Sequence, residues 1–220
     1  MTYPESSRQT PRASAFSLIE MVTVIAILTI LMTAGVKLLH GTGNQARKSA
    51  TDLLSSMIDQ ARASAIDSRS YIILAIAEPG DLTENDGRCR IGLFKLQADE
   101  WPQPSTGTIA AVQLSRWKSL ETGVVLIHGS AQGIDNPLDM PGLTLSYGSA
   151  RHANVQVRAI AFNPLGRLQY PDGSGPVALR VAEGNYRGGV PAPFQRGDSK
   201  TITESVLKIG RVTGRAYRID

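Results

Sequence analysis

The sequence predicts an α+β fold in which one long N-terminal helix packs on a mainly antiparallel β-sheet domain. An apolar run begins at residue 16 and is long enough for a helix. Apolar residues then recur at steps of three and four over residues 44–68, which is typical of an amphipathic helix. From about residue 70, short β-forming runs alternate with Gly, Pro, Asn and Asp. A helix followed by a run of strands indicates the α+β class.

The apolar run is the most informative segment of the chain. Residues 1–15 are polar and carry Arg8 and Arg12, whereas residues 16–36 contain one charged residue, Glu20. A helix of about 20 residues rises about 30 Å, which is enough to cross the hydrocarbon core of a bilayer. The preceding arginines favour a cytoplasmic N-terminus. We therefore expect a transmembrane helix over residues 16–38.

Two ordinary explanations of this segment fit less well. A secretory signal peptide has an apolar region of about 7–15 residues, and this run is longer. A plain signal anchor accounts for the length but not for Glu20. A carboxylate costs about 2.5–3.5 kcal/mol at the centre of a membrane helix, so such a residue usually has a partner.

The hexapeptide AFSLIE, residues 15–20, closely resembles the processing site of type IV prepilins and type II secretion pseudopilins. In that family a basic leader ends in a small residue, usually Gly, and is followed by Phe, a small polar residue, Leu, Ile, Glu and a long apolar helix. Ala15 stands here in the place of Gly. The resemblance implies that residues 1–15 are a leader peptide, cleaved between Ala15 and Phe16 by prepilin peptidase, with methylation of the new Phe16 terminus.

The resemblance also implies a role for Glu20 in subunit assembly. In the family this carboxylate pairs with the amino terminus of a neighbouring subunit. A buried carboxylate and a buried ammonium are each unfavourable alone, and pairing offsets both costs. The implied partners are prepilin peptidase, other pilin or pseudopilin subunits and the inner membrane. The implied location is a single-pass inner-membrane protein with a cytoplasmic leader and a periplasmic C-terminal domain, and then a filament.

The rest of the chain is expected to form the pilin-like globular part. Residues 41–44 (GTGN) interrupt the helical pattern, which resumes over 44–68 with Arg47, Lys48 and Asp52 away from the apolar stripe. Residues 69–220 should be β-rich. Strands are expected at residues 71–77, 88–96, 124–128, 143–147, 155–162, 177–181, 206–209 and 215–219. Residues 184–197 are expected to form a long exposed loop.

Three short segments carry a second resemblance. Residues 120–126 (LETGVVL), 162–167 (FNPLGR) and 207–215 (LKIGRVTGR) look like parts of the globular domain of GspH/FimT-like minor pseudopilins. In those proteins a Phe-x-Pro-x-Gly segment turns between strands, and a strand ending in Gly-Arg closes the sheet. This resemblance implies a minor subunit.

The C-terminal third is the basic part of a chain with a net charge of +4. Residues 1–150 have a balance of −2 and residues 151–220 one of +6. Lys208, Arg211, Arg215 and Arg218 form a basic tail. Some FimT-like relatives hold DNA with a Gly-Arg-rich element of this kind, and arginine contacts to phosphate would be salt-sensitive. The alternatives are solvent-facing charges on an edge strand and contact with another pilus subunit.

Catalytic and metal-binding motifs are lacking. His40, His128 and His152 show no ligand-type spacing, and the single Cys89 suits a small core residue. We expect no enzyme, no cofactor and no metal. The sequence therefore predicts a structural subunit, made as a precursor, of a type IV pilus-like or type II secretion pseudopilus filament. The alternative is a DNA-binding minor pilin at a pilus tip that acts in DNA uptake through the basic tail.

Overall fold

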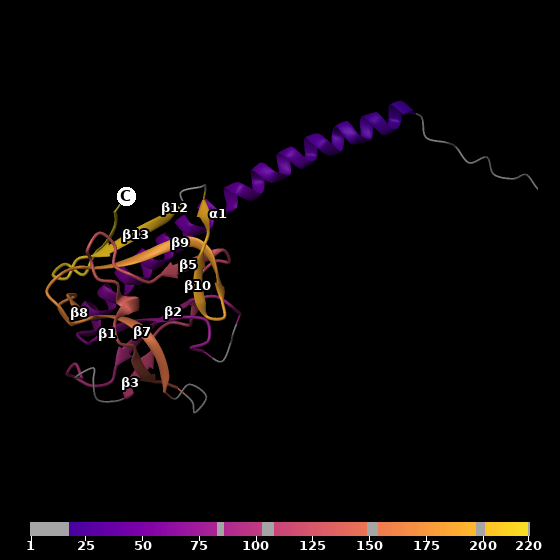
Figure 1. Ribbon diagram of the computed structural model, residues 1–220. Coiled ribbons are helices and arrows are strands. Elements are labelled where there is room, and N and C mark those ends of the chain that lie inside the picture. The colour runs from indigo at the N-terminus through magenta and orange to yellow at the C-terminus, as the bar shows by residue number, and fades with distance from the viewer. Residues whose placement is uncertain (1–17, 83–85, 103–107, 149–153, 197–200, 220) are drawn as a thin grey trace, which may run out of the picture. The chain divides into compact units, whose positions relative to one another are not determined.

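The structure is a computed structural model that describes residues 18–82, 86–102, 108–148, 154–196 and 201–219 (Figure 1). The chain divides into two compact units, Met1–Gly41 and Thr42–Asp220. Ala15 and Phe16, the expected processing site, lie outside the described residues.

The only α-helix among the described residues is α1, Leu18–Ser68. The interruption expected at residues 41–44 is not seen, because the backbone is helical through all four positions. Each glycine in a helix interior costs about 1 kcal/mol relative to alanine but keeps its N–H donor, so it does not end a helix. In the second unit the expected apolar stripe is buried: Ala50, Leu54, Met57, Ile58, Ala61 and Ala65.

Strands make up most of the second unit. The first group comprises β1 (Ile72–Ala77), β2 (Arg90–Leu96), β3 (Thr108–Gln113), β4 (Lys118–Ser119), β6 (Leu143–Ser146), β7 (Val155–Phe162) and β8 (Leu168–Tyr170). The second comprises β5 (Val124–Ile127), β9 (Val177–Arg187), β10 (Val190–Pro193), β13 (Glu204–Ile209) and β14 (Ala216–Ile219). The short strands β11 (Gln195–Arg196) and β12 (Thr201–Ile202) pair with each other, and the 3₁₀ turn η1 covers Pro137–Asp139.

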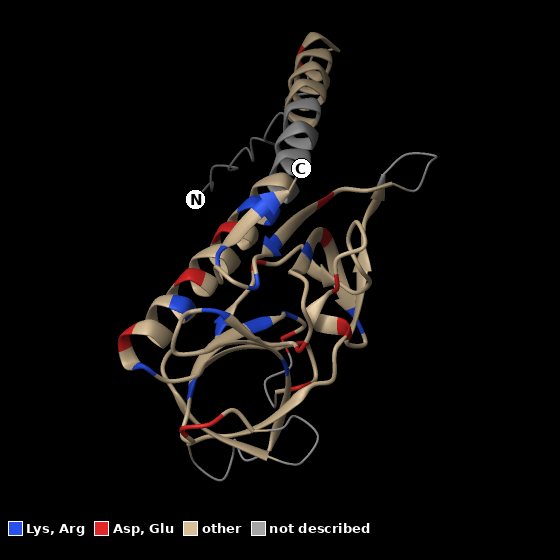
Figure 2. Ribbon diagram, turned by 90° about the vertical axis from the view of Figure 1, so that its left-hand side faces the viewer, with Lys and Arg blue, Asp and Glu red and all other residues tan. Residues whose placement is uncertain are grey.

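The first sheet closes on itself into a small barrel. Its strands pair in the order β1-β2-β3-β6-β7, and β7 also pairs with β1. All these pairings are antiparallel except β3 with β6. Figure 2 shows these strands curving round into a ring. A closed ring has no unpaired edge.

Strand β1 explains why residues 71–77 read as an almost continuous apolar run. All six residues of β1 are buried. Ile72, Leu74 and Ile76 belong to a core shared with α1, whereas the alternate side chains belong to a second core. Because side chains alternate across a strand, a strand buried on both faces is apolar at every position.

The two cores lie on either side of the barrel wall. The barrel-interior core collects alternate residues of all five ring strands, among them Ala75, Phe94, Ile109, Leu145 and Ala159. The other core collects residues from the helix stripe, from β1, β2 and β7, and from the second sheet. That second sheet has the order β10-β9-β13-β14, with β5 also paired to β9. The part of α1 in the second unit is thus held by both sheets, which confirms the expected α+β fold.

Two expectations were wrong in detail. Strand β3 lies in residues 108–113, where no strand was expected. Residues 184–197 are not one long loop, because β9 extends to Arg187 and forms a hairpin with β10. Gly188 and Gly189 make the two-residue turn with φ of 58° and 84°. Positive φ at both turn positions matches the twist of the flanking strands, and glycine adopts it without steric cost.

Candidate functional site

The N-terminal part of α1 is apolar on every side. Its large apolar residues are all about half exposed or more: Leu18, Ile19, Met21, Val22, Val24, Ile25, Ile27, Leu28, Ile30, Leu31 and Met32. Consecutive positions of a helix point in different directions, so no face of this segment is polar. A helix that is apolar all round is normally buried in a protein or in a bilayer.

Glu20 lies in the first turn of this apolar helix and is exposed. The two described threonine hydroxyls of the segment bond within the helix: Thr23 donates to the carbonyl of Ile19, and Thr29 to that of Ile25, each over 2.7 Å. Glu20 is the one ionisable residue between Leu18 and Met32, so it is the charged group on the surface of this apolar helix segment. Within the part of the chain that the structure describes, no helix is both long and apolar enough to cross a membrane.

A buried arginine fixes α1 to the second sheet near the start of the globular unit. Arg47 was expected on the polar side of the helix, but it is 6% exposed. Its Nη1 donates to Oγ of Ser205 on β13 over 3.1 Å, and its Nη2 donates to Oδ1 of Asn44. Its Nε lies 3.9 Å from Oε1 of Glu183 on β9, which is 5% exposed. Residues from two strands thus contact one helical side chain.

These contacts explain why Arg47 is buried, although the sequence predicted a position on the polar side of the helix. Arg47 falls next to the apolar stripe, and a charged residue at that position is usually solvated. Here the Ser205 hydroxyl and the Asn44 amide oxygen accept hydrogen bonds from the guanidinium, and the Glu183 carboxylate lies 3.9 Å from its Nε, so the buried cation has polar partners and a nearby anion. Ser49 Oγ adds a bond over 2.6 Å to Glu121. The start of the packed helix is held by polar contacts rather than by apolar packing alone.

The basic tail does not act as one set of equivalent cations. Arg211 donates from Nε to the carbonyl of Gly175 over 2.6 Å and from Nη1 to the carbonyl of Pro171 over 2.8 Å. Burial lowers the pKa of the Arg211 guanidinium, while the carboxylates of Asp172 and Asp135 raise it. The guanidinium of Arg211 is therefore bound to two backbone carbonyls of the loop between β8 and β9.

The other three tail residues point in different directions. Lys208 pairs with Tyr217 across β13 and β14, and its Nζ lies 5.6 Å from the ring centroid. Arg218 pairs with Leu207, one residue along, so it lies on the opposite face of the sheet. Arg215 is exposed just before β14. Lys208 and Arg218 thus lie at neighbouring positions of the β13–β14 pair, but their side chains extend from opposite faces of the sheet.

Two turns that carried the second resemblance meet in space. The first, residues 163–167, is organised by Asn163, whose Oδ1 accepts the N–H groups of Leu165 and Arg167 over 3.0 and 3.1 Å. The second, residues 210–214, joins β13 to β14. The N–H of Leu168 donates to the carbonyl of Arg211 over 2.9 Å and links the two turns.

Glycines allow this contact. Gly214 has φ of 62°, and a Cβ placed on it would lie 2.1 Å from the carbonyl oxygen of Gly166. Gly166 has φ of 71°, and a Cβ there would lie 2.7 Å from Cδ1 of Ile66 on α1. Arg62 donates from Nε to the carbonyl of Thr213 over 2.7 Å. The sequence indicated a turn at residues 162–167, but it did not show that this turn packs against residues 210–214 and against the helix.

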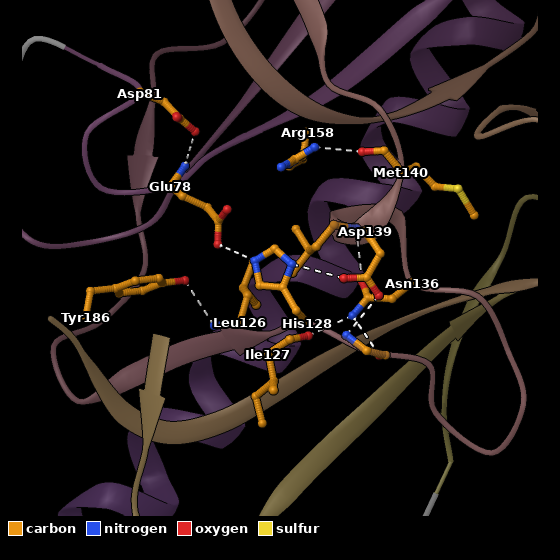
Figure 3. A network of polar contacts seen from close by, with 12 residues as sticks. Glu78, Asp81, Leu126, Ile127, His128, Asn136, Asp139, Met140, Arg158 and Tyr186 are labelled. Atoms are coloured by element: carbon orange, nitrogen blue, oxygen red, sulfur yellow. Dashed lines mark hydrogen bonds and ion pairs between the residues drawn. The ribbon is translucent and has the colours of Figure 1, made fainter. Parts of the chain in front are cut away.

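His128 joins elements of the two sheets in a polar network that sequence reasoning missed (Figure 3). Its Nε2 lies 3.0 Å from Glu78 after β1, and its Nδ1 lies 3.0 Å from Asp139 in η1. Arg180 on β9 donates to its carbonyl over 3.1 Å. An imidazolium can donate to both carboxylates, whereas a neutral imidazole donates from one nitrogen only. This network fits a structural link between the sheets.

Among the described residues, no group of three or more His, Cys, Asp or Glu side chains is placed to hold a metal ion. Cys89 is buried, and burial raises the pKa of its thiol. A buried, protonated thiol is a poor nucleophile, which agrees with the expected core position.

Comparison with known proteins identifies one family in the N-terminal segment. The family described as "Prokaryotic N-terminal methylation motif" matches residues 10–36. No curated protein matches the sequence. A solved structure, the type IV minor pilin FimU of Pseudomonas aeruginosa, is 14% identical, with 81% of this chain and 92% of that chain covered and a TM-score of 0.39. The methylation motif at residues 10–36 includes the first turns of a long helix, and mainly antiparallel sheets follow that helix; in these respects the chain is type IV pilin-like.

Proposed function

We propose that the chain is a subunit, and a minor one, of a type IV pilus-like or type II secretion pseudopilus filament. In this proposal residues 1–15 are a leader that prepilin peptidase removes between Ala15 and Phe16. The new Phe16 terminus is methylated. Before assembly the subunit waits in the inner membrane as a single-pass protein with its C-terminal domain in the periplasm. It then joins the filament through its N-terminal helix.

One observation supports this proposal above the others. The methylation motif at residues 10–36 includes the start of a helix that is apolar all round and whose single ionisable residue before Lys37 is Glu20. Such a helix suits first a bilayer and then a bundle of like helices. Glu20 suits the ammonium of a neighbouring, cleaved subunit.

The processing step is the first prediction. Co-expression of the full chain with prepilin peptidase should give a mature protein that begins at N-methylated Phe16, as measured by mass spectrometry of the intact subunit. An inactive peptidase variant is the control and should leave Met1 or the intact leader in place. An intact leader with active peptidase, or cleavage after Ala34, would contradict the proposal. An Ala15→Gly variant should be cleaved at least as fast, because glycine is the usual residue there.

Assembly should depend on the charge of Glu20. A Glu20→Gln variant keeps the shape of the side chain but cannot form an ion pair with a terminal ammonium. We expect normal membrane insertion and cleavage, and a loss of about tenfold or more in the subunit recovered from sheared filaments, since about 1.4 kcal/mol changes an equilibrium tenfold. Thr23→Val is the matched control, because the Thr23 hydroxyl bonds within its own helix. Equal incorporation of both variants would remove the assembly role of Glu20.

DNA uptake through the basic tail is the alternative function, and the geometry favours the structural role. Arg211 is engaged by two carbonyl groups, and Lys208 and Arg218 lie on opposite faces of the sheet. The phosphate backbone of DNA would be bound best by cations that lie together on one face of the sheet. The assignment to a minor subunit rests on the resemblance of residues 162–167 and 207–215 to GspH/FimT-like proteins.

A further inference from the structure

A small apolar surface stands out at the turns 163–167 and 210–214. Leu165 is 71% exposed and Val212 is 70% exposed, and Ile66 on α1 beside them is 43% exposed. We call these three residues the two-turn surface. They come from three separate parts of the chain that meet at Gly166, which contacts Ile66 and Gly214.

The two-turn surface is held in place by its backbone. Asn163 closes the first turn by accepting two N–H groups and by donating its own N–H to the carbonyl of Arg167 over 2.9 Å. The second turn is closed by the N–H of Gly214, which donates to the carbonyl of Gly210 over 2.8 Å. Leu165 and Val212 are therefore presented by ordered turns, so a partner that covers them would not have to order this backbone.

Cations border this surface. Arg167 and Arg215 follow directly after the two glycines in contact, and both are exposed. The stem of Arg62 passes both glycines, with its Cδ 3.1 Å from the Cβ position of Gly214. Arg211 in the same turn is balanced by the nearby Asp172. Arg62, Arg167 and Arg215 thus outnumber the exposed Asp67, which follows Ile66 on α1, and the border of the apolar centre is more basic than acidic.

We propose that the two-turn surface docks a protein surface of another filament subunit that has an apolar centre and carboxylates at its rim. Two exposed apolar side chains at the centre favour a protein over DNA, because a phosphate backbone gives no gain from covering them. That the partner is a filament subunit rests on the function proposed above.

A second copy of this chain is a poor partner for this surface. Among the described residues of the globular unit, its other exposed apolar pairs are Val112 with Leu114 and Val190 with Phe194. Arg116 and Lys118 follow the first pair in the chain, and Arg187 and Arg196 flank the second. If either pair docked on the two-turn surface of a second copy, these cations would approach Arg167 and Arg215, and such repulsion disfavours association.

Site-specific photocrosslinking in the full-length chain, in cells that assemble the filament, tests this proposal. A benzophenone amino acid replaces Leu165 or Val212, and Val190, 65% exposed on β10, is the matched control. Crosslinked peptides are then identified by mass spectrometry. We expect Leu165 and Val212 to crosslink to one other pilin-like subunit, at a peptide with Asp or Glu beside apolar residues, and Val190 not to reach that peptide. Arg167→Glu with Arg215→Glu should reduce the yield by roughly tenfold, whereas Arg116→Glu with Arg187→Glu, the same change in charge, should not.

The outcomes separate this proposal from the proposed function. If the subunit is cleaved and found in filaments but gives no crosslink at either position, the docking surface is wrong and the filament role stands. If the subunit is never cleaved or incorporated, the filament role is wrong. A nuclease-sensitive adduct at Leu165 would assign the surface to DNA instead. A crosslink to a second copy, or equal yields from both charge variants, would overturn the proposal that the partner is a different subunit with carboxylates at its rim.

Discussion

An Arg47→Ala variant is expected to lose about 3–5 kcal/mol of the free energy of unfolding. The substitution removes the guanidinium from a site where Arg47 is 6% and Glu183 is 5% exposed. The Glu183 carboxylate stays buried without that cation, and Ser205 loses a donor. Removal of a nearby cation from a buried carboxylate is among the few causes of such large losses.

This loss can be measured by denaturant unfolding of the full chain in mild detergent. Trp101 and Trp117 pack against the barrel-interior core, so their fluorescence reports on unfolding of the globular unit. Lys48→Ala, at the exposed neighbouring position, is the control and should change stability little. The double variant Arg47→Met with Glu183→Leu should recover most of the loss, because apolar residues of similar volume often replace a buried ion pair without cost. If Arg47→Ala and Lys48→Ala are equally stable, the ion pair does not hold the helix.

Gly214→Ala is the second variant with a large expected effect. The new Cβ would lie 2.1 Å from the carbonyl oxygen of Gly166, and the backbone of Gly166 cannot move without displacing Ile66. We expect a loss of about 3 kcal/mol or more, from the forced shift of a packed backbone together with the left-handed φ of 62°.

Gly133→Ala separates these two causes. Gly133 has φ of 76°, but a Cβ there would meet nothing within 4 Å. It should therefore show only the backbone penalty of about 1–2 kcal/mol. The comparison uses the same unfolding assay. Equal losses in the two variants would mean that the contact between the turns contributes nothing to stability.

The fold class could be predicted from the sequence because its signals are local. The stripe over residues 44–68 and the runs at 72–77 and 155–162 each show their burial within one element. Barrel closure was not predictable in this way. It depends on β3, whose sequence TIAAVQ is short and half exposed, and on its parallel pairing with β6, in which Thr108 lies beside Thr144. Nothing local specifies such a pairing.

The hairpin of β9 and β10 could have been found. Gly188-Gly189 between two β-forming runs is a hairpin signal. Pro191 and Pro193 concealed it, because proline disfavours central strands, yet β10 pairs only with β9 among the described strands and can accept proline.

The candidate sites divide in the same way. The processing motif is contiguous, so residues 15–20 could be interpreted from the sequence alone. Arg47 with Glu183 and His128 with Glu78 are pairs that only the folded chain brings together. The basic tail shows the opposite case, since neighbours in sequence, Lys208 and Arg218 among them, are separated onto two faces by the strands that carry them.

The closed barrel also sets an order in which the chain can fold. Ile72 at the start of β1 pairs with Phe162 at the end of β7, so the ring cannot close until the ribosome has added the intervening residues. At roughly 5–20 residues per second, that delay is on the order of 5–20 s. Until then the uncharged hexapeptide of β1 has an unpaired edge and is prone to aggregation. The helix that precedes it is already made and can cover one face, so we expect α1 and β1 to associate early and the ring to close last.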